Sequence, residues 1–198
     1  MDSRGALLER MALCQSSDTV AGVYFQYALE YVEAHGSHEA LAEARLAAGR
    51  SVRVEASAIL PATRLLYLLD VVGRVAEAQL RPFALGLVEV GEATGRGLFP
   101  VGQGRETARS DSPFAALEQL PALTRATCSF GVRTFVHLAP SVARLRVLGD
   151  LLGPAWNAGL VRGATTGGTG LENLRVSVDV HGPSGCDMDI WLRWRELH

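Results

Sequence analysis

Apolar and charged residues alternate along the last third of the chain. Ala143, Leu145 and Val147 alternate with Arg144 and Arg146. Two later segments repeat the pattern, with Leu174, Val176, Val178 and Val180 set against Arg175, Ser177 and Asp179, and with Met188, Ile190, Leu192 and Trp194 set against Asp187, Asp189, Trp191 and Arg193. A period of two predicts an antiparallel sheet that packs a core on one face and exposes the other face.

The segments before this sheet have helical patterns separated by glycine and proline. The predicted helices cover 19–34, 38–48, 61–80, 82–94 and 114–128, after a helical extension over 1–16, and the stretch 95–113 is predicted to be irregular. The predicted strands are 131–138, 142–148, 173–180 and 187–195, with a helix from Pro154 between the second and third strand. The prediction is one α/β (α+β) domain, residues 17–198, with a helical part (17–128) and a sheet part (129–198). Its N-terminal helices pack on one face of a four-stranded antiparallel sheet with a C-terminal β-β-α-β-β order.

Composition and charge exclude several classes of function. The chain has a net charge of −2 and contains no lysine, so a Walker A phosphate lysine and Schiff-base chemistry are excluded. The net charge argues against nucleic-acid binding. Cys14, Cys128 and Cys186 are widely spaced and form no C-x-x-C pair, which argues against a disulfide framework and a zinc site. Without a membrane span or signal peptide in the sequence, a cytoplasmic protein is expected.

Several short segments together resemble a known family. They are 18–25, the Leu65–Leu69 block after Pro61, 130–133, 154–159 and 192–194. The chain resembles, from Ser17 to its C-terminus, a large paralogous family of unknown function from myxobacteria. The resemblance implies a fold similar to haem-nitric-oxide-binding domains, 4-vinyl-reductase-like domains and TRAPP subunits. Members of that fold group bind haem, small molecules or protein partners, and they are often dimeric.

No catalytic or cofactor motif is evident in the sequence. The haem-binding relatives need an axial histidine and a Tyr-x-Ser-x-Arg motif, and no such motif occurs here. Asp187 and Asp189, with His181 nearby, are better explained by cross-strand charge pairing than by metal binding. We therefore expect no cofactor, no metal and no enzymatic activity.

Two surfaces remain as candidate binding sites. The first is the outer sheet face, whose arginines and tryptophan are typical of protein interfaces: Arg144, Arg146, Arg175, Asp189, Trp191 and Arg193. Trp191 on that face would need a partner surface or a cation–π contact with Arg175 or Arg193. The alternative for this face is a solvated surface whose charges pair with each other.

The second candidate is an aromatic group on the helices: Tyr24, Tyr27, Tyr31, Tyr67 and Trp156. These residues are explained either by core packing or by a pocket for a small apolar ligand. The main hypothesis for function is a non-enzymatic signalling or scaffold module that binds a protein partner or a second copy of itself. The alternative is a sensor domain that binds a small apolar ligand in the tyrosine-lined pocket.

Overall fold

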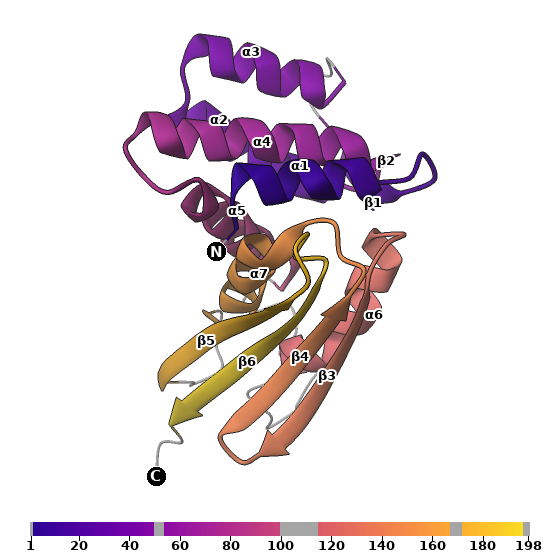
Figure 1. The fold of residues 1–198 in the computed structure, drawn as a ribbon, viewed down its shortest axis with the longest axis vertical. Helices are drawn as coiled ribbons and strands as arrows, with labels where there is room; N and C mark the ends of the chain where they lie inside the picture. The colour runs from indigo at the N-terminus through magenta and orange to yellow at the C-terminus, as the bar shows by residue number, and fades with distance from the viewer. Residues whose placement is uncertain (1, 50–53, 100–114, 167–171, 196–198) are drawn as a thin grey trace.

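The computed structural model describes residues 2–49, 54–99, 115–166 and 172–195 (Figure 1). Its helices are α1 (Arg4–Leu13), α2 (Val23–His35), α3 (His38–Ala47), α4 (Ala62–Ala78), α5 (Phe83–Leu98), α6 (Ala115–Thr127) and α7 (Gly153–Thr166). Its strands are β1 (Thr19–Ala21), β2 (Ile59–Pro61), β3 (Val132–Ala139), β4 (Val142–Leu148), β5 (Glu172–His181) and β6 (Asp187–Arg195).

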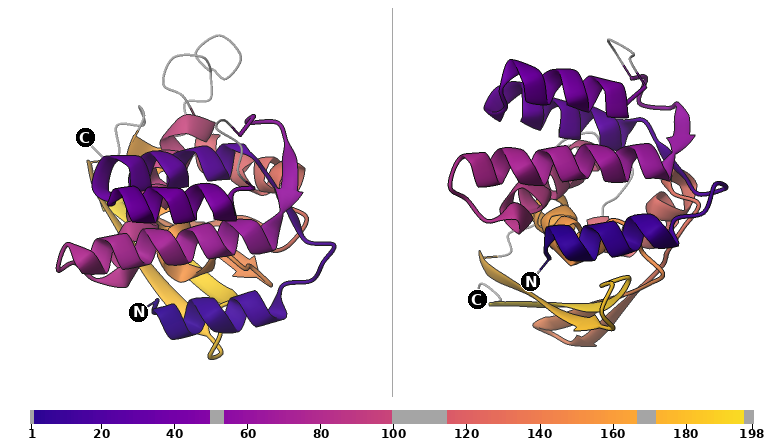
Figure 2. Two further views of the ribbon diagram at one scale, coloured as in Figure 1. Left: turned by 90° about the horizontal axis from the view of Figure 1, so that it is seen from above. Right: turned by 45° about the horizontal axis from the view of Figure 1, so that its top comes forward.

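The large sheet has the strand order β3-β4-β6-β5, and every neighbouring pair is antiparallel. Leu145 on β4 and Val178 on β5 both lie opposite Ile190 on β6. The apolar side chains of β4 and β6 are buried as the alternation predicts, and the helices cover this face alone (Figure 2). The predicted fold class and the β-β-α-β-β order of the C-terminal part are confirmed.

The helices form layers above the sheet. α7 lies next to the sheet and packs against α5, while α4 packs against α5, α2 and α3 (Figure 1). Leu65, Leu66, Leu68 and Leu69 of α4 are at most 1% exposed. α4 also contacts α1, so it is the central helix of the upper layers, although its Tyr67 side chain is exposed.

Helices α5 and α7 touch through their backbones. A Cβ atom at Gly159 of α7 would lie 2.0 Å from the carbonyl oxygen of Val88, and one at Gly91 of α5 would lie 2.1 Å from the carbonyl oxygen of Trp156. Gly95 and Gly163 make equally close contacts one turn further along the two helices. These four glycines allow the two helices to approach more closely than any larger residue would permit.

Two predicted element boundaries are wrong. Thr19–Ala21 is a strand, not the start of a helix, because Val20 pairs with Leu60 of β2 and the Gly22 N–H donates to the Ala58 carbonyl. This tertiary pairing overrides the local helical pattern, and α2 begins at Val23. α5 continues to Leu98, beyond the predicted end at residue 94. Most of the predicted irregular stretch 95–113 lies outside the described residues.

Candidate functional site: an apolar groove beside the sheet

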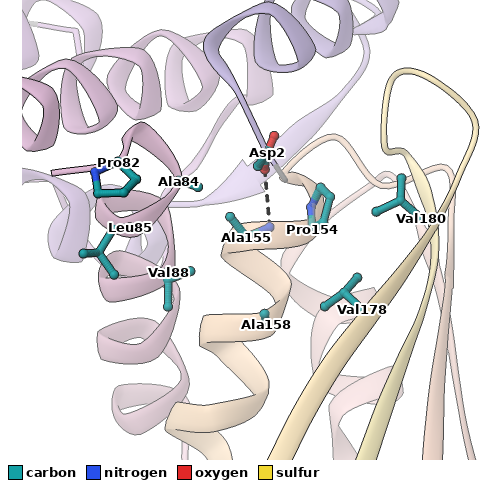
Figure 3. Close-up of a pocket in the computed structure, with 10 residues that line it drawn as sticks. All are labelled: Asp2, Pro82, Ala84, Leu85, Val88, Pro154, Ala155, Ala158, Val178 and Val180. Carbon is teal, nitrogen blue, oxygen red and sulfur yellow. Dashed lines mark hydrogen bonds between the residues drawn. The ribbon is translucent and has the colours of Figure 1, made fainter.

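A groove of about 370 Å³ lies between α5, α7 and β5 (Figure 3). The residues that line it are mostly small and apolar: Asp2, Pro82, Ala84, Leu85, Val88, Pro154, Ala155, Ala158, Val178 and Val180. Its volume is within the range of small-molecule sites, which begins at roughly 300 Å³.

The groove exists because small residues line one side of α7. Ala155 and Ala158 of α7 lie one turn apart, and Figure 3 shows them between Val88 of α5 and Val178 of β5. The alternation of β5 directs Val178 and Val180 to the helical side of the sheet. Val180 is nevertheless 44% exposed, so α7 does not cover this edge of the sheet completely.

The one acidic residue that lines the groove has its charge satisfied within the chain. The Asp2 Oδ1 atom accepts a hydrogen bond from Arg10 Nη2 at 2.9 Å, and Oδ2 accepts one from the Ala155 backbone N–H at 3.3 Å. Both side chains of this ion pair are fully buried. The groove therefore provides apolar contacts and no free charge among its lining residues.

A buried polar network positions the start of α7. Asp150 Oδ1 accepts hydrogen bonds from the backbone N–H groups of Leu152 and Gly153 and from Asn157 Nδ2. Arg133 on β3 forms an ion pair with Asp150 Oδ2. This network attaches the β4–α7 connection to β3, and so helps to hold α7 on the sheet.

The structure does not bring all residues of the predicted aromatic pocket together. Tyr24 and Trp156 pack together in the core with ring centroids 5.4 Å apart, and burial raises the pKa of Tyr24 well above 10. Tyr31 packs against His35, and Tyr27 is half-buried. Tyr67 is 59% exposed on α4 and does not join this group.

In the sequence, the residues that line the groove had no signal except the alternation of Val178 and Val180. Alanines at helical spacing, such as Ala155 and Ala158, are typical of any core.

The outer sheet face is a connected surface of charges. Asp189 accepts hydrogen bonds from Arg146 Nε at 3.0 Å and Nη2 at 3.1 Å, and interacts with His181 Nε2 at 3.2 Å. The hydrogen bond from Arg146 is the main cause that lowers the pKa of Asp189, although its burial acts in the opposite direction. Cross-strand pairing, the explanation preferred for Asp189 in the sequence, agrees with these contacts.

The contacts of Trp191 differ from the expected ones. Its Nε1–H donates to Asp179 at 2.7 Å, and the Arg144 guanidinium lies 5.7 Å from the ring centroid. The expected cation–π contact with Arg175 or Arg193 is therefore replaced by one with Arg144. The reason is register, because Arg144 lies directly opposite Trp191 on the neighbouring strand.

The described residues do not fit haem. His35, His38, His137 and His181 are all exposed, so none of these imidazoles faces an apolar pocket as an axial ligand would. Cys128 is buried, and its burial raises the pKa of its thiol, which disfavours the thiolate needed for iron ligation.

The arrangement of helices on the sheet is that of H-NOX proteins. The chain is similar to an Fe(II) unliganded H-NOX protein from K. algicida, with 10% identity over 89% of this chain and 97% of that chain and a TM-score of 0.64. A mutant H-NOX protein from S. oneidensis has 14% identity, a coverage of 89% and 96%, and a TM-score of 0.65. An oxygen-binding H-NOX domain related to soluble guanylate cyclases has 11% identity, a coverage of 88% and 93%, and a TM-score of 0.58. At these identities the similarity establishes the fold alone.

The chain belongs to the family described as protein of unknown function DUF2378, which matches residues 13–195. No curated protein matches it. In the described part of the chain, no helix combines the length and the apolar character that crossing a membrane requires. The same residues contain no group of three or more histidines, cysteines or acids that could hold a metal ion.

Proposed function

We propose that this chain is a non-enzymatic sensor domain that binds a small, neutral, apolar molecule in the groove between α5, α7 and β5. The observation that carries the proposal is the groove itself, with about 370 Å³ of space and a lining that is apolar apart from Asp2. The fold adds support, because the H-NOX proteins that share it include an oxygen-binding domain. The ligand differs from haem, since the described residues do not fit that group.

The lining residues favour a neutral ligand over a charged one. The Asp2 carboxylate is already bound by Arg10 and by the Ala155 N–H, so the described residues that line the groove include no free charged group that would bind a charged ligand. An aliphatic chain fits this lining because burial of apolar surface stabilises a complex by roughly 25 cal/mol per Å² before the costs of association.

Competition binding tests the proposal. The probe is Nile red fluorescence on the full chain, because this dye is neutral as the proposed ligand is, with 1-decanol and decanoate as competitors. We expect decanol to displace the dye more strongly than decanoate does. Val178→Phe, which places a larger side chain in the groove, should weaken decanol binding by about 10-fold or more, because filling the groove removes its space for the ligand.

The matched control is Val136→Phe on β3, a half-buried position on the other face of the sheet. This variant should bind decanol as the unmodified chain does. Failure of decanol to displace the dye, or an equal loss in the two variants, would contradict the groove as the site. Mass spectrometry of the protein purified from its native host would identify a co-purifying ligand.

The scaffold hypothesis stays a prediction. The observation in its favour is the outer face of the sheet, which carries arginines, acids and Trp191 and which no described helix covers (Figure 2).

A further inference from the structure

The charges on the outer face of β5 and β6 are sorted by sign along the strands. Arg175 of β5 lies directly opposite Arg193 of β6, and Asp179 lies directly opposite Asp189. Ser177 and Trp191 form the pair between them. One end of this strip is therefore basic and the other end is acidic, about 13 Å apart at the rise of a β-strand.

Like charges directly opposite each other destabilise a sheet. The two ends of the strip differ in the neighbouring opposite charges that offset this repulsion. At the acidic end, Arg146 and His181 contact Asp189, while Asp179 accepts the Trp191 N–H. At the basic end, both Arg175 and Arg193 are exposed, and neither belongs to the ion pairs that the described residues form, such as those of Arg146 and His181 with Asp189. Among the described side chains, the basic end therefore has no acidic partner that would offset its repulsion.

We propose that this face binds the same face of a second copy of the chain. The two-fold axis lies between the two sheets, crosses the strands, and passes at the level of Ser177 and Trp191. Such an axis reverses the strand direction, so Arg175 of one copy faces Asp179 of the other, and Arg193 faces Asp189. Each of these residues lies two positions from the central pair, so both contacts fall in the same register. The two symmetry-related Arg175–Asp179 contacts form the ion pairs, because both side chains are exposed, whereas the Asp189 side chain is 7% exposed and is already bound by Arg146 and His181.

The centre of the interface is also suited to this pairing. The axis places Trp191 of one copy opposite Trp191 of the other, and a half-buried indole is a frequent centre of a protein interface. Arg144 lies directly opposite Trp191 on β4, so the axis also brings the two Arg144 side chains together, and their repulsion opposes the pairing. A two-fold axis parallel to the strands would instead bring Arg175 of one copy against Arg193 of the other, so the order of charges on β5 and β6 favours the axis across the strands. Sheets that pack face to face keep their strands within about 30° of each other, which this pairing satisfies.

A charge swap on the full chain tests the proposal. Sedimentation velocity across a range of concentrations should show a monomer–dimer equilibrium that weakens as salt is added. Arg175→Glu and Asp179→Arg should each raise the dissociation constant by about 10-fold, because each places like charges across the axis. The double variant, Arg175→Glu with Asp179→Arg, should restore the dissociation constant to within about 3-fold, because the two ion pairs re-form with their signs exchanged.

The matched control is Arg125→Glu, the same charge change at an exposed position of α6, which should leave the dimer unchanged. A thermal melt of each variant separates a loss of association from a loss of folding. A chain that is monomeric at all concentrations would overturn the proposal. A double variant that dimerises no better than either single variant would overturn it as well. Neither result affects the proposed ligand groove, which lies on the other face of the sheet.

Discussion

Trp191 and Trp194 lie three residues apart on β6 and face opposite sides of the sheet. Trp194 is 6% exposed on the helical side, whereas Trp191 lies on the outer side under Arg144. The alternation of the sequence predicted this difference. The partner of Trp191 was not predictable, because the register between β4 and β6 decides which arginine lies opposite it.

We expect Trp194→Ala to lower the free energy of unfolding by about 3–5 kcal/mol, as truncations of large core side chains do. Trp191→Ala should cost under about 1 kcal/mol, because that side chain is partly solvated. It should weaken self-association instead, since Trp191 lies at the proposed axis. Denaturant unfolding measures the first effect and light scattering the second. Equal destabilisation by the two substitutions would show that Trp191 belongs to the folded core.

At the scale of elements, the contact between α5 and α7 depends on the absence of side chains. Gly91 and Gly95 of α5 meet Gly159 and Gly163 of α7, and a Cβ atom at any of the four positions would lie about 2 Å from a backbone atom of the other helix. Glycine usually weakens a helix relative to alanine by roughly 1 kcal/mol. These glycines are therefore explained by packing between helices and not by the local structure of either helix.

We expect Gly159→Ala to destabilise the fold by about 2–3 kcal/mol, despite the better helix propensity of alanine, because the new methyl group pushes α7 away from Val88. The control is Gly5→Ala in α1, where a Cβ atom would lie 3.8 Å from Ser3 Oγ, an ordinary van der Waals distance. That substitution should change stability by at most about 0.5 kcal/mol. Thermal melts of both variants decide the question, and a stabilised Gly159→Ala protein would refute close backbone packing.

At the scale of the whole molecule, α1 connects parts of the chain that are distant in the sequence. Nearly all of α1 precedes the residues that match the family. The family match begins at residue 13, and α1 covers Arg4–Leu13. Arg10 is fully buried, donates to the carbonyl oxygens of Leu151 and Ser184, and forms an ion pair with Asp2. One side chain thus joins the N-terminus, the start of α7 and the turn between β5 and β6.

We expect Arg10→Met to destabilise the protein by about 3–5 kcal/mol, because it leaves the buried Asp2 carboxylate without its counter-charge. Arg45→Met, at an exposed position of α3, should cost at most about 0.5 kcal/mol. Guanidinium unfolding compares the two variants. If Arg10→Met unfolds at the same denaturant concentration as Arg45→Met, the N-terminal ion pair does not contribute to the stability of the fold.

The sequence alone determined the sheet, its exposed and buried faces, and most of the helices. These features follow from local periodicity, because a side chain's direction is set by its position in a strand or helix. Only the tertiary structure decided the groove, the α5–α7 glycine contact, the β1–β2 pairing and the ion pair between Asp2 and Arg10. Each of these depends on the distance between segments that are remote in the chain, and alanines, glycines and single charges have no periodic signal that encodes such distances.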